Sequence, residues 1–185
     1  MTETTRRSAR RNFSKANERV ADHRAPESGD VKVVTTVIGP DQYRIVATAT
    51  FESAPADVWA LLSDWEGLVT VGLPGLTSDF AWLTGGPDQV PSTFQFVVAG
   101  SILKEEIYER TAAEAMGRYR LRYRALEPAL GVVEYDAVIE LQRVDEVRTA
   151  FSAERQVRLA PGDAPDTLAG MVESETRCLK EYFAA

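Results

Sequence analysis

The chain has 185 residues, of which 44% are hydrophobic and 26% are charged, a composition typical of one globular domain with its own core. The single Cys178 excludes an internal disulfide, and the only histidine, His23, lies outside the predicted core, which excludes Ser-His-Asp and Cys-His catalysis there. The net charge of −7 argues against nucleic acid as a partner of the folded part. No apolar run reaches the roughly 18 residues of a membrane span. Because the chain has a single cysteine and no Cys/His cluster with zinc-site spacing, we expect a cytoplasmic protein.

The first 30 residues differ in composition from the rest. Residues 1–24 hold seven Lys or Arg and three acidic residues, so they carry about +4 and the remainder about −11. A segment with so little to bury is expected to be disordered, and we assign 1–30 as a basic N-terminal tail and 31–185 as one domain. A helix formed by the tail on a nucleic-acid, membrane or protein partner is the alternative.

The rest of the chain predicts strands followed by one long helix. Residues 42–51 alternate and are rich in β-branched side chains, which indicates a strand. Ser53 is the expected N-cap of a short helix beginning near Pro55, and a second short helix or turn follows over 66–76. Six more strands are predicted over 78–84, 92–99, 102–110, 118–126, 132–144 and 147–159.

The last element changes period. After Gly162 and Pro165, apolar residues recur near every 3.6 positions, which predicts a long helix with one face on the sheet. Its stripe consists of Leu168, Met171, Val172, Glu175, Leu179, Tyr182 and Phe183. This order predicts an α+β fold in which a seven-stranded antiparallel sheet curls around the helix and leaves an internal cavity.

Carboxylates and tyrosines in the strands are the candidates for chemistry. The chain has no Gly-rich phosphate loop of the Walker or dinucleotide type, so acid–base work or positioning is the chemistry that its residues allow. In the predicted strand 102–110, alternation places Glu105, Ile107 and Glu109 on one face and Glu106 on the other. A glutamate in a strand is often solvated, and this alternative stays open.

Several short sequence motifs occur at defined places in this predicted order of strands and helices. They are Ala54-Pro55-Ala56-Asp57-Val58-Trp59, Asp64-Trp65, Glu105-Glu106-Ile107, Glu134-Tyr135-Asp136-Ala137 and Ala153-Glu154-Arg155. In this order they resemble the START/birch-pollen-allergen superfamily (SRPBCC), and within it the polyketide cyclase/dehydrase-like branch. The resemblance covers about residues 42–183 and implies a helix-grip fold with two short helices after the first strand.

The resemblance also implies site residues. In the plant abscisic-acid receptors, which are similar at a distance, a Glu, a Tyr and a Glu of three strands face the ligand, and the matching residues are Glu105, Tyr135 and Glu154. These three are the catalytic candidates. The expected cavity wall consists of Trp82, Phe94, Phe96, Ile107, Tyr119, Tyr123 and Met171, for which an ordinary core role is the alternative. The receptors' gate, latch and anchoring lysine have no counterpart, so hormone reception is not expected.

The function implied by the resemblance is the binding of a hydrophobic, polyketide-, sterol- or lipid-like molecule. A polyketide cyclase/aromatase-like enzyme would move protons in an aldol or dehydration step, and no cofactor and no metal are expected. A non-catalytic carrier or sensor is the first alternative. An interaction protein whose basic tail recruits partners is the second, because a fold does not determine function.

Overall fold

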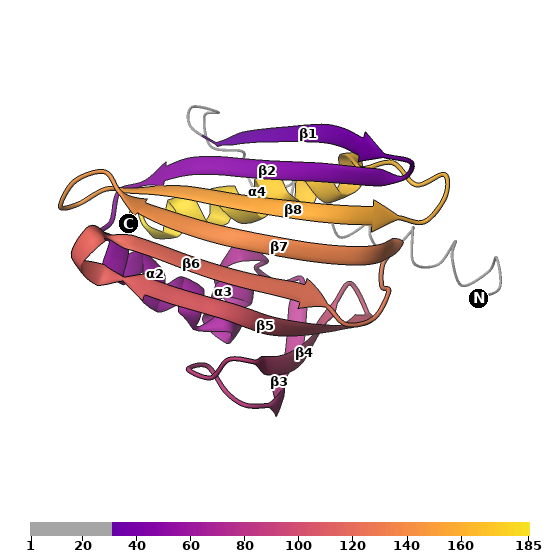
Figure 1. Ribbon diagram of the computed structural model, residues 1–185, viewed down its shortest axis with the longest axis horizontal. Coiled ribbons are helices and arrows are strands. Elements are labelled where there is room, and N and C mark those ends of the chain that lie inside the picture. The colour runs from indigo at the N-terminus through magenta and orange to yellow at the C-terminus, as the bar shows by residue number, and fades with distance from the viewer. Residues whose placement is uncertain (1–30) are drawn as a thin grey trace.

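The structure is a computed structural model that describes residues 31–185 (Figure 1). The predicted disordered tail, residues 1–30, lies outside the described residues. The elements, in chain order, are β1 (Lys32–Gly39), β2 (Gln42–Phe51), α2 (Pro55–Ser63), α3 (Trp65–Gly72), β3 (Thr77–Thr84), β4 (Ser92–Val98), β5 (Ser101–Ala113), the 3-10 turn η1 (Glu114–Met116), β6 (Arg118–Ala125), β7 (Val132–Arg143), β8 (Thr149–Leu159) and α4 (Asp166–Tyr182).

The strands form one antiparallel sheet in the order β1-β2-β8-β7-β6-β5-β4-β3. The α+β helix-grip architecture is therefore confirmed, with eight strands in place of the seven predicted. The additional strand is β1, a run of β-branched residues that turns back at Pro40 and Asp41 and pairs with β2 from Lys32↔Thr48 to Gly39↔Gln42.

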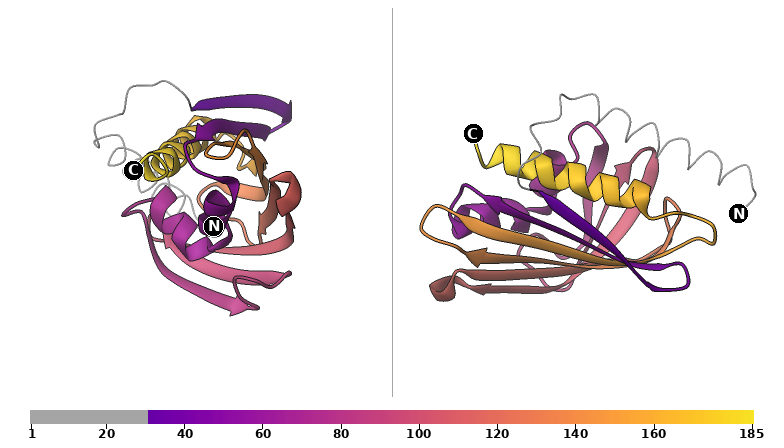
Figure 2. Two further views of the ribbon diagram at one scale, coloured as in Figure 1. Left: turned by 90° about the vertical axis from the view of Figure 1, so that its left-hand side faces the viewer. Right: turned by 90° about the horizontal axis from the view of Figure 1, so that it is seen from above.

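The sheet is strongly curved, and α4 lies on its concave side beside α2 and α3 (Figure 2). Leu168, Val172, Thr176 and Leu179 form the buried stripe of α4, which confirms the predicted phase of the helix. The prediction was wrong for Tyr182, which is 53% exposed at the end of the helix. Alternate residues of β2 and β8 complete this part of the core, among them Ile45, Ala47, Val157 and Leu159. No helix within residues 31–185 is long and apolar enough to cross a membrane.

The first helix begins one residue later than Ser53 would require. Ala54 is the N-cap of α2, and Pro55 occupies the first turn, where its missing N–H costs nothing. The Ser53 carbonyl instead accepts a hydrogen bond of 2.7 Å from the Thr149 hydroxyl, which ties the start of α2 to β8. The predicted N-cap was therefore wrong.

A β-bulge in β5 changes which side chains face inward. The register runs Ile107↔Tyr123 and then Glu109↔Arg122, so Tyr108 is the extra residue. Beyond the bulge, Glu109 points outward toward Arg120 and Arg122. The predicted common face of Glu105, Ile107 and Glu109 therefore holds for the first two residues only.

Candidate ligand-binding site

A cavity of about 90 Å³ lies between the concave face of the sheet, α3 and α4. Its walls are mostly apolar and come from α3, the strands β4 to β8, the connection between β6 and β7, and α4. The polar and the large side chains of its lining include Trp65, Phe96, Glu105, Tyr123, Tyr135, Arg155, Met171 and Glu175. A mainly apolar cavity with a few convergent polar groups is the usual form of a small-molecule site.

One buried network forms the polar end of the cavity. The Arg155 guanidinium binds Glu175 through Nη2 at 2.6 Å and donates from Nε to the Tyr135 hydroxyl at 2.9 Å. The Tyr135 and Tyr123 hydroxyls lie 3.2 Å apart and share a further hydrogen bond. Burial raises the pKa of Tyr135 to about 12 and that of Tyr123 well above its ordinary value, so both phenols are neutral hydrogen-bonding groups.

Glu175 approaches the cavity because α3 and α4 pack closely. A Cβ atom on Gly72, the last residue of α3, would lie 3.0 Å from the Glu175 Cγ atom. Glycine at this point leaves room for the Glu175 stem as it crosses toward β8. Arg155 is only 3% exposed, and its ion pair with Glu175 supplies the partner that a buried guanidinium requires.

Glu105 is the second carboxylate of the cavity. Its side chain is buried, with 5% exposure, whereas Glu106 faces the other way and binds Arg124. This confirms the predicted orientation of the strand at these two positions. Burial, and then the nearby charge of Glu175, raise the pKa of Glu105 to about 8, against a smaller lowering by Arg155. Glu105 therefore holds a proton at neutral pH.

Three polar atoms of cavity-lining residues lack a partner within the described part of the chain. They are Glu105 Oε2, Arg155 Nη1 and Trp65 Nε1, all of them buried. A buried polar group without a hydrogen bond costs on the order of 1–3 kcal/mol, and such groups in a cavity wall are where a ligand or water is stabilised. Two of the three are obligatory donors, and the third becomes a donor when Glu105 is protonated.

Glu154, predicted to face the cavity, lies on the opposite face of β8. Its side chain is 23% exposed and accepts a hydrogen bond of 2.5 Å from Arg44 of β2, which lowers its pKa. The inner residue is its neighbour Arg155. The motif match was therefore wrong by one position, because the inward face of β8 belongs to the alternating residues Phe151, Ala153, Arg155 and Val157.

The predicted wall residues divide into two groups. Phe96, Tyr123 and Met171 line the cavity. The other four, Trp82, Phe94, Ile107 and Tyr119, belong to the hydrophobic core or pack against it. For example, Trp82 meets Phe94 edge to face at 5.6 Å, and Tyr119 stacks on Trp59 at 5.2 Å. These four residues support the site by packing and do not form its wall.

The sequence interpretation missed Arg155 and Glu175. The sequence contains a pattern that could have found both. Arg155 alternates in step with the apolar residues of β8, and Glu175 lies within the predicted apolar stripe of α4. A charged residue within an apolar periodicity indicates a buried, paired charge, and two such residues on neighbouring elements indicate an ion pair.

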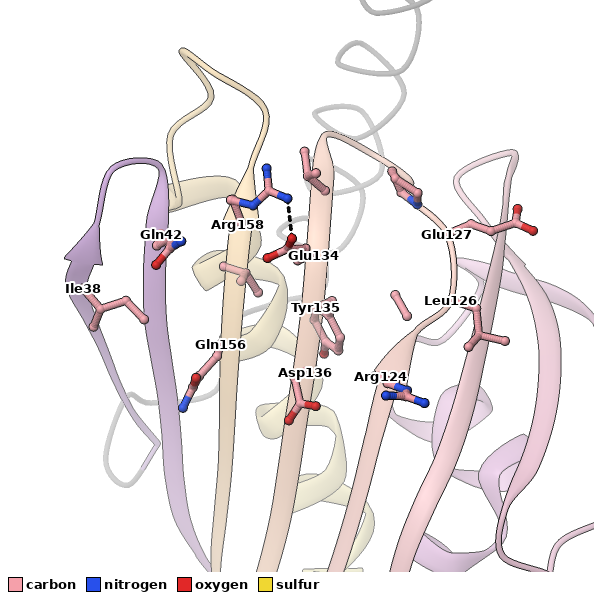
Figure 3. A pocket seen from close by; sticks show the side chains of 14 residues that line it. Ile38, Gln42, Arg124, Leu126, Glu127, Glu134, Tyr135, Asp136, Gln156 and Arg158 are labelled. Carbon is pink, nitrogen blue, oxygen red and sulfur yellow. Dashed lines mark hydrogen bonds and ion pairs between the residues drawn. The ribbon is translucent and has the colours of Figure 1, made fainter.

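A second, open pocket of about 450 Å³ lies on the outer face of the sheet, away from α4 (Figure 3). It is lined by side chains of both charges, including Arg158, which binds Glu134 across β7 and β8. The two pockets share Tyr135, whose hydroxyl binds Arg155 on the inner side. Hence the Tyr135 ring forms part of the wall between the inner cavity and the outer face.

The inner cluster offers a proton, two fixed hydrogen-bond donors and an apolar wall. Glu105 can give and take a proton near neutral pH, and Arg155 can donate to a ligand oxygen. Among the side chains of residues 31–185, no group of three or more His, Cys, Asp or Glu is arranged to hold a metal ion.

The fold is similar to those of several solved structures. The human StarD13 lipid transfer and protein localization domain aligns with a TM-score of 0.63 at 10% identity, covering 92% of this chain and 94% of that one. A START superfamily protein from Mycobacterium smegmatis gives 0.61 at 10% identity, covering 76% and 97%. The Zhui aromatase/cyclase from a Streptomyces species gives 0.59 at 20% identity, covering 77% and 94%.

At the level of sequence, neither a family model nor a curated protein matches this chain. The structural similarities show a START-like, SRPBCC-type helix-grip fold, as the sequence motifs had predicted. Fold and cavity together define the class: a helix-grip domain with an internal cavity.

Proposed function

We propose that the protein binds a small, largely apolar molecule in the inner cavity and acts on it as a polyketide cyclase/aromatase-like enzyme. The observation that carries this proposal is Glu105, a buried carboxyl group that holds its proton at neutral pH beside Arg155. A group whose pKa lies near the working pH is suited to general acid–base catalysis. The similarity to an aromatase/cyclase fold supports the same class of reaction.

The proposed step is the dehydration of a β-hydroxy carbonyl compound. Arg155 donates a hydrogen bond to the carbonyl oxygen, and Glu105 gives its proton to the hydroxyl group as the C–O bond breaks. The resulting carboxylate takes the proton from the neighbouring carbon, which leaves an enone and water and restores Glu105. Tyr135 is a positioning residue, since its hydroxyl holds Arg155 in place.

The size of the cavity limits the ligand. At about 90 Å³ it is smaller than the 300–1,000 Å³ typical of drug-sized sites, so a long chain requires wall side chains to move. A compact ligand is therefore favoured over a sterol. Met171, unbranched and half-buried, is the wall residue best suited to such a movement.

Native mass spectrometry of the purified protein would identify a retained ligand, and the variants Glu105→Gln and Glu106→Gln would test the site. We expect Glu105→Gln to reduce turnover by about a hundredfold, which is the usual effect of losing a catalytic proton transfer. Glu106→Gln is the matched control on the opposite face. Equal activity of both variants would contradict the enzymatic role.

A carrier or sensor of a lipid-like ligand is the second candidate. It is favoured by the similarity to a lipid transfer domain over 92% of this chain. In this case Glu105→Gln would change ligand affinity, and no conversion would be detected with either variant.

The sequence supports three further proposals. They are a cytoplasmic location, a single domain over residues 31–185 and a partner for the basic residues 1–24.

A further inference from the structure

We propose that Glu175 sets the ligand specificity of the cavity: by neutralising Arg155 it selects an uncharged carbonyl or hydroxyl head over a carboxylate or an amine. This inference rests on the proposed function, since it concerns a ligand in the same cavity, and it names the chemical class of that ligand. It assigns to Glu175 a role in selection that is separate from any proton transfer.

Three ionisable side chains line the interior of the cavity: Glu105 from β5, Arg155 from β8 and Glu175 from α4. The other charged lining residues are satisfied at the rim or outside. Lys104 binds Glu127 at 2.9 Å in an exposed pair, and Glu134 binds Arg158 on the outer face.

The remaining walls add no charge to the interior. The strands β6 and β7 present the neutral phenols Tyr123 and Tyr135. The contributions of α3, of the residue that follows it and of β4 are apolar or aromatic: Trp65, Leu68, Val69, Leu73, Phe96 and Val98.

The interior is electrically neutral as a whole. Arg155 and Glu175 cancel each other at 2.6 Å, and Glu105 keeps its proton because burial and the Glu175 charge both oppose its ionisation. In a confined site of low polarity, every unpaired charge is costly, so the neutral state is the one a ligand must preserve.

A neutral oxygen fits this arrangement. A ligand carbonyl can accept hydrogen bonds from Arg155 Nη1 and from protonated Glu105 Oε2, two atoms that have no hydrogen-bond partner within residues 31–185. A ligand carboxylate would add an anion beside Glu175, and beside Glu105 when that group is ionised, with Arg155 as the single guanidinium. An amine would have to displace the Glu105 proton before it found a counter-ion. The cavity therefore disfavours a carboxylate through repulsion between anions. It disfavours an amine through the free energy needed to ionise Glu105. Specific sites often exclude competing ligands in this way.

The same reasoning predicts that one substitution reverses the selection. Glu175→Gln keeps the shape of the side chain and removes the counter-ion of Arg155, so the interior gains one positive charge. Guanidinium binds carboxylates in charge-assisted hydrogen bonds, and a ligand carboxylate can then take the place of Glu175. Glu173→Gln, on the same helix but bound to Arg177 outside the cavity lining, is the matched control.

Three phenyl probes of similar size test the proposal: acetophenone, benzoate and α-methylbenzylamine, titrated by calorimetry into the purified full-length protein near pH 7. The wild type should bind acetophenone at least about tenfold more tightly than either charged probe, as expected for an unpaired buried charge. Glu175→Gln should gain about tenfold or more for benzoate while acetophenone changes less than about threefold. Glu173→Gln should match the wild type.

A wild type that prefers benzoate or the amine would overturn the inference and leave the proposed function intact. Failure of all three probes to bind would contradict the cavity function itself and remove the inference with it. Should Glu175→Gln not fold, the wild type provides a second measurement between pH 6.5 and 8.5. Ionisation of Glu105 then makes the interior negative, so the amine must gain affinity and acetophenone must not; unchanged affinity of the amine would overturn the proposal.

Discussion

Arg155 of β8 and Glu175 of α4 form an ion pair of 2.6 Å that joins the sheet to the long helix across the cavity. Arg155→Met leaves Glu175 without its counter-ion, and we expect a loss of about 3–5 kcal/mol in the free energy of unfolding. Combining Arg155→Met with Glu175→Leu removes both charges and should restore most of this loss, because an apolar pair of similar volume replaces them.

Urea denaturation measures this difference. The pair Arg177–Glu173, at 2.5 Å on an outer part of the same helix, provides the control. Arg177→Met should cost less than about 1 kcal/mol, because an ion pair that remains partly in contact with solvent contributes little. Similar losses for Arg155→Met and Arg177→Met would show that the inner pair is not buried as described.

The raised pKa of Glu105 predicts how stability depends on pH. The folded protein holds a proton up to a pKa of about 8, whereas the unfolded chain releases it near the ordinary value of 4.5. The contribution of the protonated group is thus fully present below pH 4.5 and is lost as pH rises toward 8, with a slope of at most about 1.4 kcal/mol per pH unit. Glu105→Gln should remove this slope.

Denaturation of wild type and Glu105→Gln at several pH values between 4.5 and 8.5 tests the prediction. The variant should gain stability relative to the wild type as pH rises. Glu106→Gln should show the wild-type slope and stay within about 0.5 kcal/mol of the wild-type stability, as for a surface position. A parallel pH dependence in all three proteins would mean that Glu105 ionises normally.

The pH dependence of turnover tests the proposed proton transfer. A general acid must start protonated, so the rate should be constant below pH 8 and fall about tenfold per pH unit above the pKa of Glu105, which lies near 8. Assays with a β-hydroxy ketone, under saturating conditions, measure this profile. A rate that increases through pH 8 would assign Glu105 the role of a base in the resting state instead.

Tyr135→Phe tests the hydrogen-bond network. The change leaves the ring in place but removes the acceptor of Arg155 Nε and the partner of the Tyr123 hydroxyl. We expect a loss of about 1–3 kcal/mol in stability and weaker ligand binding. Tyr108→Phe is the control, since that hydroxyl donates to Asp136 on the outer face, and it should leave ligand affinity unchanged. Equal effects on affinity would argue against the inner site.

Met171→Trp tests the position of the cavity. The larger side chain should fill the space between α4 and the sheet and reduce ligand affinity by about tenfold or more, with a modest cost from overpacking. Met116→Trp makes the same change on η1, where the methionine is exposed, and should have no effect on binding. Thermal melting of both variants separates a blocked cavity from an unfolded domain.

Much of the fold could be predicted because its signals are local. Alternation identified seven of the eight strands, and a period of 3.6 identified α4, since these patterns report which side chains meet the core. The strand β1 carried the same signal, a β-branched run before Gly39 and Pro40, and was overlooked. The bulge at Tyr108 could not be predicted, because a register shift depends on the partner strand.

The candidate site was predicted only in part. Within β5, alternation correctly separated Glu105 from Glu106, because burial on a strand follows parity. In β8, a motif match selected Glu154 although the apolar neighbours of Arg155 indicated the other face. Here the physical pattern within the sequence was a better guide than the resemblance.

What the sequence by itself determined is therefore the order of the elements and the face that most residues occupy, because the hydrophobic effect acts through local periodicity. The tertiary structure decided which charges meet. Arg155 and Glu175 are 20 residues apart on different elements, and their ion pair exists only because α4 packs on the concave side of the sheet, where the Glu175 side chain reaches Arg155 of β8. The proton on Glu105 follows from that arrangement, since its pKa depends on burial and on the Glu175 charge, and neither is a property of the strand alone.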